Sequence, residues 1–140
     1  MPPDAMTPTP IVPDPTPTSQ PFWDALAEGR VEIQHCADCG AWVYYPRARC
    51  SSCLSANLRW EQISGEGTLY TYTVARQPTT PAFADAGEMV IAVIELDEGP
   101  KMTTTLENVA VDAVRIGMRV RPCFAPTGGD LTLLRHQPAT

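Results

Sequence analysis

The chain has 140 residues, which allows one domain or two very small ones. Its 16 acidic and 10 basic side chains give a net charge of −6, and this balance argues against a generic nucleic-acid surface, which needs clustered positive charge. No apolar run approaches the ~18 residues of a membrane span, so we expect no contact with a membrane.

The first twenty residues are a proline-rich arm. Residues 1–20 hold seven of the 15 prolines together with Thr, Ser and Asp, and they contain no Lys or Arg. This composition has nothing to bury and predicts an extended, mostly disordered segment. Because the arm lacks a basic n-region and an apolar h-region, it does not resemble a signal peptide. We therefore expect a cytoplasmic protein whose cysteines are thiolates rather than disulfides.

A short helix is predicted over residues 21–29, with the sequence PFWDALAEG. Pro21 suits the first helical position and Gly29 suits the stop. At barely two turns this helix is not stable alone, so its aromatic side chains must dock on something. Two interpretations stay open: Phe22 and Trp23 belong to the chain's own core, or they anchor a partner protein.

Four cysteines dominate the next stretch. They form two C-x2-C pairs separated by ten residues, and each pair can present two thiolates from one tight knuckle. Four thiolates about 2.3 Å from a metal in a tetrahedron make a closed structural zinc site, so we predict one zinc and no metal catalysis. A rubredoxin-type iron centre, two disulfides and a redox C-x-x-C are the alternatives. The predicted ligands are Cys36, Cys39, Cys50 and Cys53.

Short segments on both sides of the cysteines predict a three-stranded zinc ribbon. In the first of them apolar and polar residues alternate from Val31 to Gln34, which predicts an inner apolar face and an outer polar face. Helix and ribbon together make an expected unit at 21–62, with strands at 30–35, 42–45 and 58–61.

The ribbon is locally basic, with aromatic residues interleaved. Such a surface could meet phosphate or an acidic partner, and a solvated ribbon edge explains it equally well. The basic residues are Arg47, Arg49 and Arg59, the acidic ones Asp38 and Glu61, and the aromatic ones Trp42, Tyr44 and Tyr45.

A second, all-β unit is predicted over residues 63–140. Segment 89–96 is almost wholly apolar, which predicts a central, buried strand, and Pro122 predicts an edge or a bulge. A short helical turn, with Asp112 as a plausible cap, separates the third and fourth strands. Five strands in this order are typical of an OB-type barrel. We expect them at 68–74, 89–96, 101–106, 119–124 and 131–135.

No catalytic constellation is present in the sequence. It contains no Gly-rich phosphate loop, nucleophile elbow or HExxH motif. His35 and His136 are far apart, and His35 precedes a zinc ligand and is expected to pack on the ribbon. Cys123 is expected to be a small buried hydrophobe. Tyr70 and Tyr72, on one face of a strand, could stack bases, and core packing explains them equally well.

Four ordered motifs carry a family resemblance: PFWDALAEGRVEIQHCADCGAWVYYPRARCSSC, SGEGTLYTYTV, VIAVIELDEGP and VRIGMRV. Together they resemble the bacterial and archaeal family that joins a rubredoxin-like zinc ribbon to a C-terminal OB-fold. The resemblance runs from about residue 21 to residue 134 and leaves the arm outside.

The resemblance implies an accessory role. Members of this family accompany a thiolase-like subunit, or are fused to acyl-CoA hydratase-like domains, in complexes similar to thiolases, acyltransferases and steroid side-chain aldolases. The catalytic residues lie in the partner, and the small subunit stabilises it and borders its acyl-CoA channel. We therefore expect a non-catalytic subunit of a hetero-oligomer such as α2β2, with acyl-CoA at the shared interface. A nucleic-acid-binding OB module and a free-standing acyl-CoA-binding protein are the alternatives.

The loop at 77–87 is the expected docking side, since this side of the OB domain tends to approach the partner in the resembling family. Its prolines limit the entropy lost on docking, and a guanidinium at its base can meet a phosphate or a carboxylate. The expected contacts with the partner or acyl-CoA are Phe22, Trp23, Arg76 and Phe83.

Overall fold

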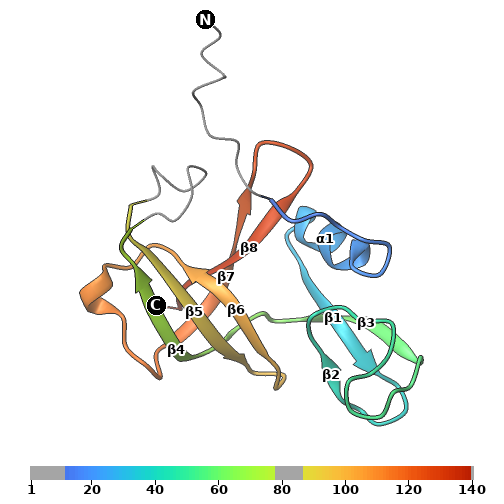
Figure 1. Cartoon of the computed structure of the whole chain (residues 1–140). Helices are drawn as coiled ribbons and strands as arrows, with labels where there is room; N and C mark the ends of the chain where they lie inside the picture. Colours follow the sequence, from blue (N-terminus) through green and yellow to red (C-terminus); the bar gives the residue numbers. More distant parts are fainter. Residues whose placement is uncertain (1–11, 78–86, 140) are drawn as a thin grey trace, which may run out of the picture.

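A three-stranded ribbon stands beside a closed five-stranded barrel, and one short helix contacts both (Figure 1). The structure is a computed structural model that describes residues 12–77 and 87–139. It confirms the predicted fold class, which is mainly β with a short helix, a ribbon and an OB-type barrel. In the part of the chain that the structure describes, no helix is long and apolar enough to cross a membrane.

The helix α1 (Gln20–Ala27) follows a hydrogen-bonded turn. Ser19 is buried, and its Oγ accepts a hydrogen bond of 2.9 Å from the backbone N–H of Thr16. This turn corrects the predicted extent of the disordered arm, which cannot include its last residues because they are tied to the helix. Residues 1–11 lie outside the described residues.

The ribbon is an antiparallel sheet in which the first strand lies in the middle. The second strand is shorter than predicted, because the chain leaves the sheet at Tyr44, whose ring lies 5.9 Å from that of Phe22 in α1. The strands are β1 (Val31–Cys36), β2 (Trp42–Val43) and β3 (Leu58–Ile63).

The barrel closes in the order β4-β5-β6-β8-β7. Along the chain, the 3-10 helix η3 (Val111–Ala113) lies between β6 and β7, which are the third and fourth barrel strands in sequence. Asp112 lies inside η3 and does not cap it, because the capping position is Ala110. Among the described residues, β7 beyond Val120 pairs with β8 alone, which places Pro122 at an unpaired edge, as predicted. The strands are β4 (Gly67–Ala75), β5 (Met89–Leu96), β6 (Lys101–Leu106), β7 (Arg119–Pro126) and β8 (Thr132–Pro138).

Two predictions about the barrel's faces are wrong. β5 is central but not wholly buried: its residues alternate between the core and solvent, and Ile91 is 38% exposed. Tyr70 and Tyr72 do not share a face, because the register of β4 shifts between Leu69 and Thr71. This bulge leaves Tyr70 54% exposed, while Tyr72 packs against the core.

One hydrophobic cluster extends through helix, ribbon and barrel. Phe22 and Trp23 of α1 are only 2% and 7% exposed, and their rings meet edge to face at 5.1 Å. The two-turn helix is therefore held by tertiary packing rather than by its own propensity. The other members include Leu26, Val31, Ile33, Ile63, Leu69, Val90, Ile94, Leu96, Met102, Leu106 and Val120.

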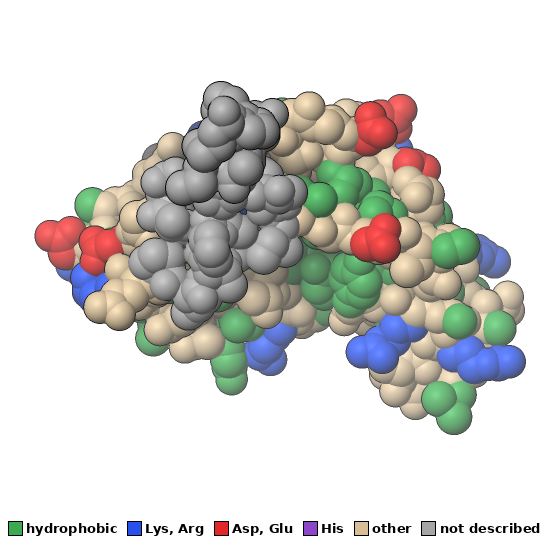
Figure 2. Space-filling view, turned by 45° about the horizontal axis from the view of Figure 1, so that its top comes forward, with side chains coloured by type: hydrophobic (Ala, Val, Ile, Leu, Met, Phe, Trp, Pro, Cys, Tyr) green, Lys and Arg blue, Asp and Glu red, His purple; other side chains and the backbone are tan. Residues whose placement is uncertain are grey.

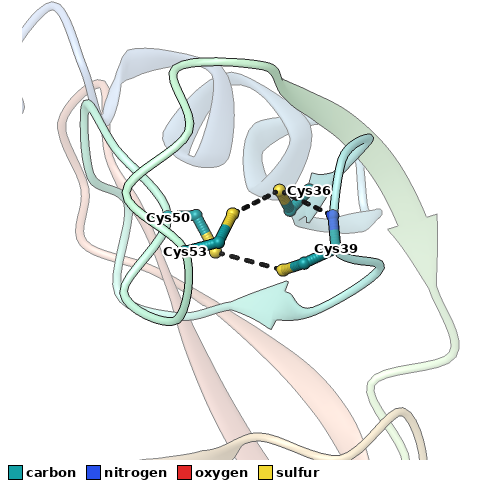
Figure 3. A group of neighbouring side chains, drawn as sticks. All are labelled: Cys36, Cys39, Cys50 and Cys53. Carbon is teal, nitrogen blue, oxygen red and sulfur yellow. Dashed lines mark hydrogen bonds between the residues drawn. The ribbon is translucent and has the colours of Figure 1, made fainter.

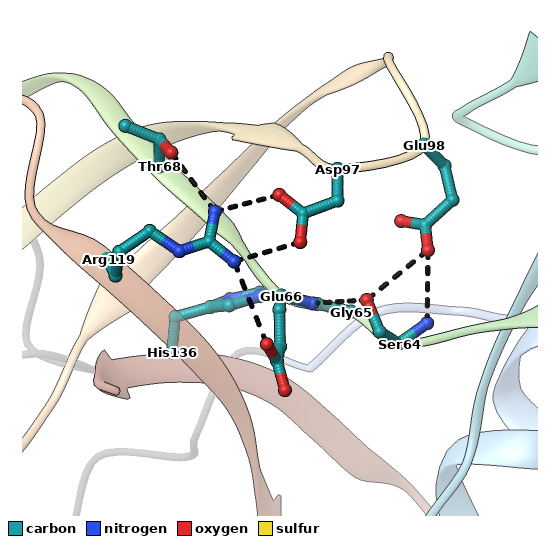
Figure 4. Close-up of polar contacts among 8 residues, drawn as sticks. All are labelled: Ser64, Gly65, Glu66, Thr68, Asp97, Glu98, Arg119 and His136. Atoms are coloured by element: carbon teal, nitrogen blue, oxygen red, sulfur yellow. Dashed lines mark hydrogen bonds and ion pairs between the residues drawn. The ribbon is translucent and has the colours of Figure 1, made fainter. Parts of the chain in front are cut away.

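The link between ribbon and barrel is held from the inside by His136 (Figure 4). Its Nε2 donates to the Gly65 carbonyl (2.9 Å), so its Nδ1 accepts from Thr104 Oγ1 (3.0 Å). Gly65 has φ +74, and a Cβ there would lie 2.9 Å from Cγ of Pro122. Both the backbone conformation and the available space therefore require glycine at this point.

Polar contacts hold the same link from the outside (Figure 4). The backbone N–H and Oγ of Ser64 both donate to Oε2 of Glu98, at 3.2 Å each. Arg119 binds Asp97 through two parallel hydrogen bonds of 2.8 Å and lies 3.7 Å from Glu66. These contacts connect the end of the ribbon to the β5–β6 turn and to β7.

Candidate metal centre

Two equivalent knuckles present the four cysteines. In the first, Gly40 N donates to Cys36 O (3.0 Å) and Cys36 N donates to Ala41 O (2.8 Å). Gly40 has φ +79, the left-handed conformation that glycine adopts without strain. The second knuckle, around Cys50 and Cys53, repeats both backbone hydrogen bonds.

The four sulfur atoms face one another across the knuckles (Figure 3). All lie within 4.8 Å of each other, and the Cys36–Cys53 and Cys39–Cys50 pairs are each separated by 3.6 Å. A tetrahedron with metal–sulfur bonds of about 2.3 Å has sulfur–sulfur edges of about 3.8 Å. The donor set therefore fits a tetrahedral metal ion, and the separations are much longer than a disulfide bond.

Backbone N–H groups prepare two of the thiols as ligands. Cys39 N donates to the sulfur of Cys36 (3.5 Å), and this bond lowers the pKa of the Cys36 thiol to about 6. Backbone N–H groups of Cys53 and Ser52 likewise lower the pKa of Cys50. Because the thiolate is the form that binds metal, these hydrogen bonds favour the ligand form of both sulfurs. With four protein ligands the centre has no open position, so it is structural.

Side chains outside the ligand set hold the knuckles together. Asp38 accepts hydrogen bonds from Ser55 Oγ and Asn57 Nδ2, and these keep the pKa of its carboxyl below the usual range. They tie the first knuckle to the loop that follows the second. Such supporting contacts fix the orientation of metal ligands.

His35 is a structural residue of the ribbon, as predicted. Its ring stacks on Trp42 with centroids 4.0 Å apart, and it forms hydrogen bonds with Glu61 (2.8 Å) and with the carbonyl of Gly40 (3.1 Å).

Gln34 is a structural residue that the sequence pattern missed. Alternation predicts it on the solvent face, yet it is only 5% exposed. Its amide donates to the carbonyl of Arg47 and accepts from the N–H of Arg47, at 2.7 Å each. It thereby anchors the connector between the knuckles to β1. No signal in the sequence identifies it, because a buried amide requires a partner that only the fold provides.

The structure describes three of the four expected partner contacts. Phe22 and Trp23 lie in the core, which corrects their prediction as exposed anchors and supports the alternative that they pack within the chain. Arg76 forms an ion pair with Glu88 across the base of the loop. Phe83 lies outside the described residues.

The remaining candidates for chemistry lack activating neighbours. His136 is fully buried, and this burial lowers its pKa to about 4, so the ring is neutral at physiological pH. Cys123 is half-buried, and loss of solvation raises the pKa of its thiol. A thiol with a raised pKa is a poor nucleophile. Neither His136 nor Cys123 is therefore prepared as a catalytic base or nucleophile.

Comparisons with known proteins agree with this architecture. The ribbon matches the family model described as "ChsH2, rubredoxin-like zinc ribbon domain" over residues 23–59. The barrel matches "ChsH2, C-terminal OB-fold domain" over residues 60–125. Together with the four-sulfur geometry, the first match identifies the metal as zinc.

Curated relatives fall into two kinds. A "Probable enoyl-CoA hydratase alpha subunit" of Thermomonospora curvata is 36% identical over 121 residues, which are 84% of this chain and 37% of that protein. A "DUF35 domain-containing scaffold protein" of Pyrococcus furiosus is 31% identical over 99 residues, covering 71% of this chain and 72% of that one. The chain thus spans little more than a third of the hydratase subunit.

A solved structure matches nearly the whole chain. One chain of the "Ltp2-ChsH2(DUF35) aldolase" superposes with a TM-score of 0.81 and 32% identity, covering 92% of this chain and 100% of that one. A DUF35 protein from Sulfolobus solfataricus, with 18% identity and a TM-score of 0.61, shares the fold. The chain therefore belongs to the ChsH2/DUF35 family of proteins that combine a rubredoxin-like zinc ribbon with an OB-fold.

Proposed function

We propose that this chain is a non-catalytic accessory subunit of a thiolase-like acyl-CoA enzyme. The observation that carries the proposal is its similarity to the full ChsH2(DUF35) chain of an aldolase complex, at a TM-score of 0.81. The names of the relatives support the same class, since one is an alpha subunit of an enoyl-CoA hydratase and another is a scaffold protein.

The described residues support the non-catalytic part of the proposal. The zinc centre has four protein ligands and cannot take a substrate as a further ligand. His35 and His136 use both ring nitrogens in hydrogen bonds within the protein. The chemistry of the complex would then belong to the partner subunit, with this chain holding that subunit in its active conformation.

The finer part of the proposal concerns the substrate and the assembly. The hydratase alpha subunits of Thermomonospora curvata and Mycobacterium tuberculosis are named for CoA esters, and the name of each implies a second kind of subunit. We propose by analogy a hetero-oligomer such as α2β2, in which this chain borders the channel that admits the acyl-CoA.

Co-expression tests the assembly. This chain, with an affinity tag, is produced together with a candidate thiolase-like protein of the same organism, and the complex is isolated by the tag and by size exclusion. The proposal predicts a stable complex that contains both chains in equal amounts. Elution of the two proteins as separate species would contradict it.

A further inference from the structure

Leu54 occupies a position where the first knuckle has glycine. Its N–H donates to the carbonyl of Cys50 at 3.0 Å, as the N–H of Gly40 does to Cys36 at 3.0 Å. Its φ is +65, close to the +79 of Gly40. Glycine adopts this left-handed conformation without strain, whereas a leucine Cβ approaches the following carbonyl oxygen. The second knuckle therefore carries a strained residue that its own fold does not require.

The Leu54 side chain makes few contacts within the isolated chain. Leu54 is 70% exposed, more than any other large hydrophobic residue described. Ile116, at 66%, is the nearest in exposure and lies in the β6–β7 connection, on the barrel rather than on the ribbon. Backbone strain and apolar exposure coincide at Leu54, and strain of this kind persists most often at functional sites.

One arginine contacts this leucine, and two more exposed arginines lie on the same ribbon. Figure 2 shows basic side chains beside scattered apolar ones at the ribbon end of the molecule, where the sequence has arginines and no lysine. Arg49 donates from Nη1 to the carbonyl of Leu54 at 3.3 Å. Asp38 is engaged by Ser55, and Glu61 by His35. On the ribbon, the exposed arginines without an ion pair among the described residues are Arg47, Arg49 and Arg59; Arg115 and Arg121 share this property on the barrel.

Neutralisation of the metal centre explains only part of this pattern. Four thiolates and one Zn²⁺ carry a net charge of −2, which nearby arginines would offset. That role needs no exposed leucine, and it would be served equally by glycine at position 54. An exposed apolar side chain on a ribbon that carries unpaired arginines is instead the composition of a protein-binding hot spot.

We propose that Leu54 with Arg47, Arg49 and Arg59, here called the ribbon tip, is a docking surface for an acidic protein surface that contains an apolar pocket. The leucine fills the pocket, and the arginines pair with carboxylates around it and steer the encounter. The identity of the partner as the thiolase-like subunit rests on the proposed function. The ribbon tip would be the surface through which the accessory subunit contacts that partner.

The variant Leu54→Gly tests the leucine without damage to the knuckle, since it restores the residue found at Gly40. We expect full zinc content, an equal or higher melting temperature, and an affinity for the thiolase-like subunit reduced at least about tenfold. Ile116→Ala is the matched control, an exposed apolar residue away from the ribbon, and it should leave the affinity unchanged. Affinities are measured by titration calorimetry with purified subunits.

The double variant Arg47→Gln, Arg59→Gln tests the charges. We expect weaker binding with a smaller dependence on salt concentration, and unchanged zinc content, because rim charges act through screened attraction. If zinc is lost more readily while the affinity for the partner is unchanged, the arginines serve the metal centre and the proposal is wrong.

The outcomes separate the two proposals. Binding of Leu54→Gly with wild-type affinity overturns the docking surface and leaves the proposed function intact. Failure of the wild-type chain to bind overturns the proposed function and the docking surface with it. If light scattering shows a dimer of this chain that Leu54→Gly abolishes, while the partner affinity is unchanged, the occupant is a second copy and the proposal is also wrong.

Discussion

The imidazole of His136 donates a hydrogen bond of 2.9 Å from Nε2 to the carbonyl of Gly65. This contact joins the last strand of the barrel to the chain that arrives from the ribbon. Both residues are buried, so the bond is shielded from water. This hydrogen bond holds the zinc ribbon in a fixed position relative to the barrel.

Acid should weaken this joint through His136. Burial lowers its pKa to about 4, against ~6.5 in an unfolded chain, so protons bind the unfolded state preferentially between these values. Above about pH 6.5 the titration of His136 does not lower the unfolding free energy. As the pH falls from there to about 4, the unfolding free energy decreases by about 3 kcal/mol. Urea unfolding measured across this range should show the loss.

The matched variants isolate the histidine from the metal centre. His136→Gln should be less stable at pH 7 but should lose less stability on acidification than the wild type. His35→Gln, which changes the half-buried histidine of the ribbon, is the comparison variant. Identical pH profiles for the wild type and His136→Gln would contradict this assignment.

Gly65→Ala should destabilise the same joint. The new Cβ would lie 2.9 Å from Pro122 and 3.1 Å from Val31, in a backbone conformation that strains any residue but glycine. We expect a loss of at least about 2 kcal/mol of unfolding free energy. Gly128→Ala is the control, since Gly128 has φ +87 with nothing within 4 Å, and it should cost only about 1 kcal/mol. Equal losses in the two variants would show that the close contact is unimportant.

Phe22→Ala should unfold the N-terminal part of the chain. Its side chain is 2% exposed in the cluster that joins α1 to ribbon and barrel, so truncation should cost about 3–5 kcal/mol. Trp23→Phe should cost under about 1 kcal/mol, because it keeps most of the volume and removes an Nε1–H with no hydrogen-bond partner among the described residues. Thermal melting of the isolated chain checks both. A Phe22→Ala variant that melts like the wild type and binds the partner weakly would restore the interface interpretation.

The zinc ligands and the positions of the strands were accessible from sequence, because each depends on local spacing. Two C-x2-C pairs specify ligand geometry, and segments such as 101–106 carry their own β-pattern. Whether Phe22 and Trp23 pack in the core or at an interface could not be predicted, since an amphipathic helix presents the same apolar stripe to a core and to a partner. The bulge at Tyr70 and the buried amide of Gln34 depend on strands and connectors that meet only in the folded chain.

Cys53→Ser should remove the metal and unfold the ribbon. Zinc binding contributes roughly 10–16 kcal/mol in small zinc domains, and most of that is folding free energy. Metal analysis should find one zinc per wild-type chain and almost none in the variant. Cys123→Ser is the control, because Cys123 lies outside the four-sulfur cluster, and it should keep its zinc. Fully folded, metal-free wild-type protein would contradict the structural role.

The most direct test of the central claim is acyl-CoA turnover by three samples: this chain alone, the thiolase-like subunit alone, and the complex reconstituted from both. The accessory role predicts no turnover by this chain, and turnover by the complex that exceeds that of the thiolase-like subunit alone. Cys123→Ala should leave the rate of the complex unchanged. Turnover by this chain alone, abolished by Cys123→Ala, would contradict the account.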